Sequence, residues 1–314
     1  MLHSSSAKGS GHFKVQVFGS DGNERHCEQG NMLLDTWLTM MNTAGTVRYQ
    51  NMGCLVGTGT AVVLVTDTVM GNATNIKHQP SSKNDKAGYL DGNNIIYELI
   101  NVFEFPLGAV VGNISEVGLT NMGSSSDLNQ EIIARSLIKD VNGNPTTISV
   151  GTDDLLVITH TTKITVPFNT DVVSNVEFRS GQNTVVTGRF GDGYNTKFSE
   201  FCSAAYASAG WFRMRYGSGV IFGEAGVNIS GGSSTSNAVN TTFTYLTLPS
   251  WGGVEMKALV PIGTWNYSDI RAITLPAGAT NGAGFKWHFE PGLSKIITEI
   301  MELYFVRKFE RDLT

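Results

Sequence analysis

The chain contains 314 residues, carries a formal net charge of −5 with a pI near 5.7, and has charged residues at only 16% of its positions. The acidic balance excludes the broad basic face that binds a nucleic-acid backbone, and no apolar run approaches the roughly 20 residues of a membrane-spanning helix. We therefore expect neither nucleic-acid binding nor membrane insertion. A chain of this length can bury about 75% of its unfolded surface, so its core needs no disulfide or metal.

The composition favours an all-β protein. Glycine occurs 36 times and hydrophobic residues make up 41% of the chain, which together with plentiful Thr, Asn and Val indicates strands joined by tight turns. Many short strands spaced by roughly 8 to 12 residues are typical of sandwiches. We predict an all-β fold with β-sandwich-type domains, Gly/Asn-rich turns and one short N-terminal helix. The low charge also fits a chain that hides surface in an assembly.

The cysteines and the N-terminus point to synthesis in the cytoplasm. Cys27, Cys54 and Cys202 are odd in number and too widely spaced for a zinc motif, so buried free thiols are expected. The first residues, MLHSSSAKGSGH, lack the apolar segment of a signal peptide. We expect no secretion signal.

The N-terminal segment is expected to hold a strand and the helix. Residues 1–11 are predicted to be flexible, and residues 13–18, in which apolar and polar side chains alternate, to form a strand that ends in a turn at residues 20–23. A helix is predicted from Asn31, a candidate N-cap, to about Gly45. Its apolar residues at helical spacing are Leu34, Trp37, Leu38 and Met41.

Residues 54–65 are interpreted as a Gly-rich turn followed by an apolar strand. The tripeptide GTG at residues 57–59 lacks the third glycine of a dinucleotide-binding fingerprint. The β-branched residues after it favour a strand over the helix that such a site requires, so no cofactor is predicted. The polar residues 71–94 are expected to form a loop or a flap over a sheet edge, and residues 95–105 a strand.

A hairpin is predicted in the centre of the chain. Residues 132–139 have the period of a strand, and the Asn142-Gly143 dipeptide after them is the strongest short-range signal for a type I′ turn, in which both central residues have positive φ. Residues 146–150 would form the return strand, with Pro145 placed where its missing N–H costs least.

Five segments in and around this hairpin carry a family resemblance. They are GAVVGNISEVGL at residues 108–119, ARSLI at 134–138, NGNPTTI at 142–148, VGTGT at 56–60 and DTVMGN at 67–72. Together they resemble virion structural proteins of tailed bacteriophages, over roughly residues 50–165 of the chain. The resemblance implies a structural role in the phage particle.

Pro167 marks a predicted boundary between a virion-like β domain at residues 1–166, which contains the hairpin, and a second, outward-facing β-rich domain at residues 167–314. Residues 228–241 are a polar, low-complexity loop. The segment 296–309 has helical and strand character, but its β-branched and aromatic residues, and the extended end usual in the resembled family, favour a strand. Other strands are predicted at residues 172–178, 184–190, 210–216, 220–222, 243–248, 254–260, 270–275 and 284–289.

No catalytic, cofactor or metal site is predicted. The six histidines are scattered, and Asp153 and Asp154 would point to opposite faces of a strand, so a turn suits them better. Aromatic side chains between residues 211 and 267 could instead pack in the core, form a subunit interface or stack on a glycan, in that order of preference. They are Trp211, Tyr216, Trp251, Trp265 and Tyr267.

These observations lead us to expect a non-enzymatic structural component of a tailed phage virion, in the tail or an appendage such as a fibre, tip or collar. Its expected partners are copies of itself and other virion tail or neck proteins, joined through β-rich interfaces. The alternative is a receptor-binding module whose second half contacts a host-surface glycan. A glycan-cleaving enzyme ranks last, because the sequence offers no recognisable pair of carboxylates facing a groove.

Overall fold

The computed structural model describes residues 3–42, 52–121, 126–167, 171–178, 183–190, 198, 213–216, 246–247, 254–260, 267–274, 286–295 and 301–312. Trp211, Trp251, Trp265, the loop at 228–241 and the strand predicted at 220–222 lie outside these residues.

The described residues form an all-β fold with one short helix near the N-terminus, as predicted. The helix is α1 (Asp35–Asn42). The strands of the first half are β1 (His3–Phe18), β2 (Glu24–Leu33), β3 (Gly53–Gly57), β4 (Ala73–His78), β5 (Ser82–Asp85), β6 (Tyr89–Asp91), β7 (Asn94–Phe105), β8 (Gly112–Ile114), β9 (Glu116–Thr120), β10 (Ile132–Leu137), β11 (Ile148–Val150) and β12 (Leu155–Pro167). Those of the second half are β13 (Asp171–Phe178), β14 (Asn183–Phe190), β15 (Arg213–Tyr216), β16 (Leu246–Thr247), β17 (Val254–Val260), β18 (Tyr267–Thr274), β19 (Lys286–Lys295) and β20 (Met301–Arg311).

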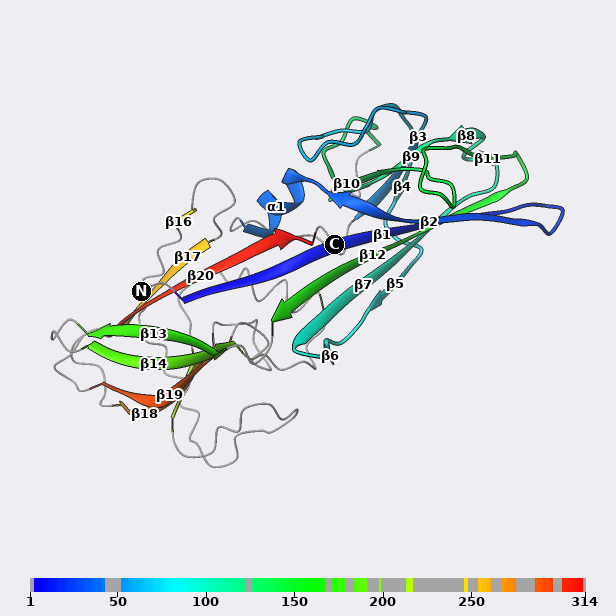
Figure 1. Ribbon diagram of the computed structural model, residues 1–314. Coiled ribbons are helices and arrows are strands. Elements are labelled where there is room, and N and C mark those ends of the chain that lie inside the picture. The colour runs from blue at the N-terminus through cyan, green and yellow to red at the C-terminus, as the bar shows by residue number, and fades with distance from the viewer. Residues whose placement is uncertain are drawn as a thin grey trace.

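Strand β1 is the centre of the first group of strands (Figure 1). Along one edge it pairs antiparallel with β12, β12 pairs with β7, and β7 carries β5 and β6. Along its other edge β1 has two partners in succession, because β20 runs parallel to its first residues and β2 forms a hairpin with its last ones. Phe13, Val15 and Val17 alternate along β1 and are fully buried, as a half-buried strand requires.

Strand β2 joins this group to a second one. Its last residues, Met32 and Leu33, leave β1 and pair with β10, from which the sheet continues through β9 and β3 to β4. Buried side chains from both groups form one core cluster, which includes Trp37 of α1 packed edge-on against Phe309 of β20. The C-terminal strand therefore packs with the N-terminal part of the chain.

The second half of the chain continues the same sheet. Strand β20 pairs with β13 and β17 as well as with β1, and β14, β19, β18 and β15 follow one another. The strand predicted within residues 296–309 is thus confirmed. Among the described strands, all except the β8–β11 pair are hydrogen-bonded into one curled, mostly antiparallel sheet. Sandwich-type packing and the division at Pro167 stay predictions.

Two expectations for the N-terminal segment are wrong. Residues 3–11, expected to be flexible, belong to β1 because they pair with β12 and β20. Asn31 lies on β2 and caps no helix; α1 begins at Asp35, after Leu34. Residues 71–94, expected to form a loop or a flap over a sheet edge, contain β4 and the short strands β5 and β6, which pair along the edge of β7. In each of these segments, pairing with another strand overrides local composition.

The central turn is present, but it is not of type I′. Gly143 has a φ of +81°, whereas Asn142 does not have positive φ. The carbonyl of Asp140 accepts the Gly143 N–H at 2.9 Å, and its carboxylate accepts the N–H groups of Asn142 and Asn144, each at 2.9 Å. An aspartate at the first position of a turn stabilises ordinary type I geometry in this way.

The return segment of this hairpin is also shorter than predicted. The N–H of Thr146 donates to the carbonyl of Ile138 at 2.8 Å, and Lys139 forms an isolated bridge with Pro145. Beyond this point β11 pairs with β8 instead of β10. Only the part of the predicted hairpin next to the turn therefore forms.

Replacing Gly143 by Val should lower the free energy of unfolding by about 1 kcal/mol or more, because a β-branched residue is strained at positive φ. No atom lies within 4 Å of a Cβ built on Gly143, so the cost comes from the backbone alone. Urea denaturation measures it. Gly143→Asn is the control, since Asn tolerates this conformation better, and equal losses in both variants would contradict the backbone explanation.

His160 should make the protein less stable in mild acid. Its ring is fully buried against Phe13, and burial, with a smaller effect of the charge on His12, lowers its pKa from the ordinary 6.5 to about 3. The unfolded chain takes up a proton near pH 6.5 and the folded one does not. This contribution to stability is complete above pH 6.5 and falls as the pH drops towards 3.

Between pH 7.5 and pH 5.0 the wild-type protein should therefore lose about 2 kcal/mol of unfolding free energy through this histidine. Urea denaturation at the two pH values, on wild type and on His160→Gln, measures the loss. The variant should lose less than the wild type, and an equal loss would show that another group is responsible.

Candidate functional site

The candidate site is built on the segment between β3 and β4, residues 58–72, which we call the strap. Val62, Leu64 and their neighbours were expected to form a strand, and this expectation is wrong. After β3 the chain leaves the sheet, and the N–H of Thr58 donates to the carbonyl of Asn72 at 3.0 Å to close the base of the loop. The apolar tip is exposed: Val62 is 77% and Leu64 is 57% accessible.

Glu116 holds the base of the strap. It lies on β9, is fully buried, and its carboxylate accepts three backbone N–H groups of the strap, from Gly59 at 3.0 Å, Gly71 at 3.1 Å and Asn72 at 2.7 Å. A Cβ added at Gly59 would lie 2.3 Å from Oε1 of Glu116. The GTG tripeptide therefore allows the backbone to approach this carboxylate closely.

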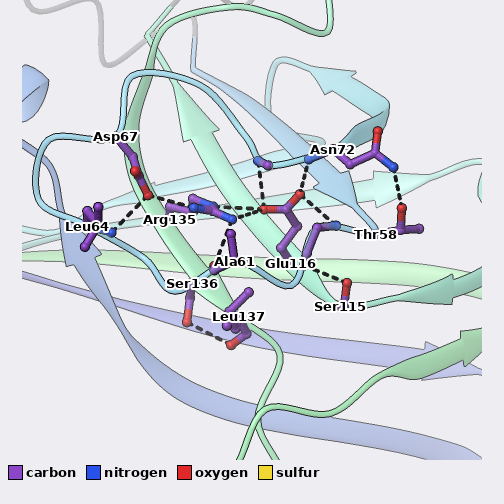
Figure 2. A network of polar contacts seen from close by, with 12 residues as sticks. Thr58, Ala61, Leu64, Asp67, Asn72, Ser115, Glu116, Arg135, Ser136 and Leu137 are labelled. Carbon is purple, nitrogen blue, oxygen red and sulfur yellow. Dashed lines mark hydrogen bonds and ion pairs between the residues drawn. The ribbon is translucent and has the colours of Figure 1, made fainter.

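Arg135, on the neighbouring strand, neutralises the carboxylate of Glu116 (Figure 2). It lies on β10, 3% of its side chain is accessible, and its Nε donates to Oε2 of Glu116 at 2.8 Å. It also donates to Oδ2 of Asp67 at 2.7 Å and to the carbonyl of Ala61 at 3.3 Å. Arg135 stands opposite Gly118, two residues from Glu116, a diagonal placement that long side chains span.

Asp67 extends this network into the strap itself. Its Oδ2 accepts the N–H of Leu64 at 3.0 Å as well as the guanidinium of Arg135. One guanidinium thus contacts a carboxylate of the sheet and one of the loop. Breaking a buried pair by removing one partner leaves an uncompensated charge and costs about 3–5 kcal/mol. The network therefore fixes the position of the strap on the sheet.

Three further hydrogen bonds to backbone carbonyls of the strap hold it on the sheet. The hydroxyl of Ser115 donates to the carbonyl of Gly59 at 2.8 Å, and the N–H of Ile132 donates to the carbonyl of Thr68 at 2.9 Å. The N–H of Asp35, at the start of α1, donates to the carbonyl of Val65 at 2.8 Å. The strap is anchored on β9, β10 and α1, so its exposed tip is held in place.

A groove of about 480 Å³ lies beside the tip, where β2 leaves β1 and β20 ends. Arg311 donates to the carbonyl of Leu33 and forms an ion pair with Asp35 at this junction. Residues of five segments line the groove: Gly9, Ser10, Gly30, Asn31, Met32, Leu33, Val62, Val63, Ser136, Leu137, Lys139, Gly143, Pro145, Arg311 and Asp312.

Of the aromatic residues proposed from the sequence, Trp211, Trp251 and Trp265 lie outside the described residues. Tyr216 lies on β15 and Tyr267 on β18, two strands that pair with each other, and only their backbone is described. The order of preference among core packing, interface and glycan contact stays a prediction. The strap site itself was missed, although Glu116 and Arg135 stand out as charged residues inside the apolar segments ISEVGL and IIARSL.

The described part of the chain contains no cluster of three or more His, Cys, Asp or Glu side chains that could hold a metal ion. No helix in it is long and apolar enough to cross a membrane. Cys27 and Cys54 are free thiols, as expected, and burial raises the pKa of both, that of Cys27 to about 11. Neither thiol is activated as a nucleophile.

Comparison of the chain with protein-family models, with curated proteins and with solved structures finds no match.

Replacing Glu116 by Gln should lower the free energy of unfolding by about 3 kcal/mol, because Arg135 would keep a buried charge with only Asp67 to balance it. Urea denaturation measures the change. The strap should also open more often, which faster cleavage by thermolysin beside Leu64 would report.

Glu98→Gln is the matched control for this substitution. Glu98 pairs with the half-exposed Lys86 at 2.7 Å, and such surface pairs contribute about 0–1 kcal/mol. Similar losses in the two variants would mean that the Glu116 network does not fix the strap.

Proposed function

We propose that this chain is a non-enzymatic structural subunit of a tailed phage particle, located in the tail or in an appendage such as a fibre, tip or collar. It assembles there with copies of itself and with other virion proteins. The proposal combines the sequence resemblance with the character of the exposed loops. Virion structural proteins act by presenting fixed surfaces to one another, so the relevant feature is a rigid surface that lacks charge.

The observation that carries the proposal is the exposed apolar tip of the strap. Residues 58–66 contain no charged side chain, and Val62, Leu64, Val65 and Val69 are all exposed. Exposed apolar side chains that gather on one loop, and are not scattered singly over the surface, are a mark of interaction sites. Because buried contacts fix the base of the strap, ordering the loop adds little entropic cost to association.

Two edge strands in the described part of the sheet carry charged side chains, so loops suit subunit contacts better than these edges do. The segment ERHCE of β2 contains three Glu or Arg residues, and the strand SKND of β5 contains one Lys and one Asp. Charged side chains on edge strands hinder the addition of another strand. Subunits of this β-rich protein would therefore meet through their loops and the faces beside them.

The proposal predicts that the chain is a component of purified phage particles and that it self-associates. Mass spectrometry of particles purified by density gradient should find the chain in a fixed stoichiometry. Sedimentation equilibrium of the purified chain should give a mass several times 33.8 kDa. Absence of the chain from washed particles would contradict the virion role, whatever its mass in solution.

A further inference from the structure

The tip of the strap and the groove are neighbours on one face of the molecule. Val62 and Val63 belong to the strap and also line the groove, and the half-exposed Met32 faces them from β2. Leu64 follows them in the sequence and is 57% accessible. This face thus presents the apolar tip of the strap directly beside the groove. The groove volume of about 480 Å³ lies within the size range of pockets that hold a small ligand. The groove has room for aliphatic side chains.

The groove carries charges of both signs. Lys139 and Arg311 on its lining are positive and Asp312 is negative, and Asp35, the ion-pair partner of Arg311, and Asp140, in the turn with Gly143, add two negative charges beside it. Two positive and three negative charges leave this face with little of the chain's net charge of −5. Two identical faces of mixed sign and small net charge can approach each other with little repulsion.

We propose that this face is a two-fold contact between two copies of the chain, in which Val62 and Leu64 of each copy enter the groove of the other. An isologous contact uses the same patch on both subunits, so the patch has to be complementary to itself. An exposed apolar tip beside the groove, on a face of mixed charge, meets this requirement. The inference rests on the proposed function as a self-assembling subunit and names the surface through which it assembles.

The first test is a charged substitution at the tip. Val62→Asp should weaken self-association at least tenfold in sedimentation equilibrium, because each contact would bury two unpaired carboxylates. Val111→Asp is the matched control, since Val111 is 58% accessible and does not line the groove. It should associate like the wild type. Unchanged urea midpoints in both variants would show that folding is intact, as expected for exposed side chains.

The second test detects the two-fold geometry directly. A Cβ on Gly30 would meet no atom within 4 Å, so Gly30→Cys places a thiol in the groove without a clash. Gly30→Cys and Val62→Cys, made as separate variants with tags of different size, are mixed and oxidised. Peptide mapping should find a disulfide between positions 30 and 62 of different copies. Associated protein without this disulfide would overturn the proposed geometry.

The outcomes separate this inference from the proposed function. If the wild type self-associates and Val62→Asp associates as strongly as Val111→Asp, the contact lies elsewhere and the inference is wrong, while the structural role stands. If the wild type is a monomer in solution but Val62→Asp no longer enters particles, the strap binds a different virion protein, and the self-contact is again wrong. Absence of the wild type from particles contradicts the proposed function instead.

Discussion

The charge of Glu116 has to be neutralised inside the protein, because this carboxylate is fully buried and an unpaired buried charge is prohibitively costly. Three backbone N–H groups of the strap and the guanidinium of Arg135 supply that neutralisation. The strap cannot move away without exposing the pair or leaving it unbalanced. One electrostatic constraint therefore determines where a loop with an exposed apolar tip lies on the sheet.

The hydrogen-bond pattern of β1 places the groove beside that tip. Two strands pair in turn with one edge of β1: β20 pairs as far as Gly9, and β2 pairs from Gly11 onwards. The groove lies where β20 ends and β2 diverges towards β10. The Arg311–Asp35 ion pair ties the end of β20 to the start of α1 at this point. A loop and a groove that are both fixed in this way can bind with little loss of conformational entropy.

Much of the secondary structure was predictable from local patterns. Alternation of apolar residues identified the strand that includes Phe13, and helical spacing around Trp37 identified α1, because burial on one face imposes those periods. Errors arose where local signals were weak or competed. The Ser-rich start of β1 has no strand pattern of its own and is ordered by β12 and β20. Asp140 changed the type of the central turn by binding the N–H groups that follow it.

The sequence by itself determined the all-β class, the low charge and most strand positions, since these follow from composition and period. It also displayed the parts of the strap site, the GTG tripeptide and the charged residues inside apolar strands, without showing that they meet. Only the tertiary structure decided that Val62 and Leu64 lie in an exposed loop, because an apolar run has the same appearance in a buried strand. The pairing of β9 with β10 brings Glu116 to Arg135, and β3 brings the strap to both. Contacts between residues 59, 67, 116 and 135 depend on which distant strands pair, and a segment taken alone does not show its partner.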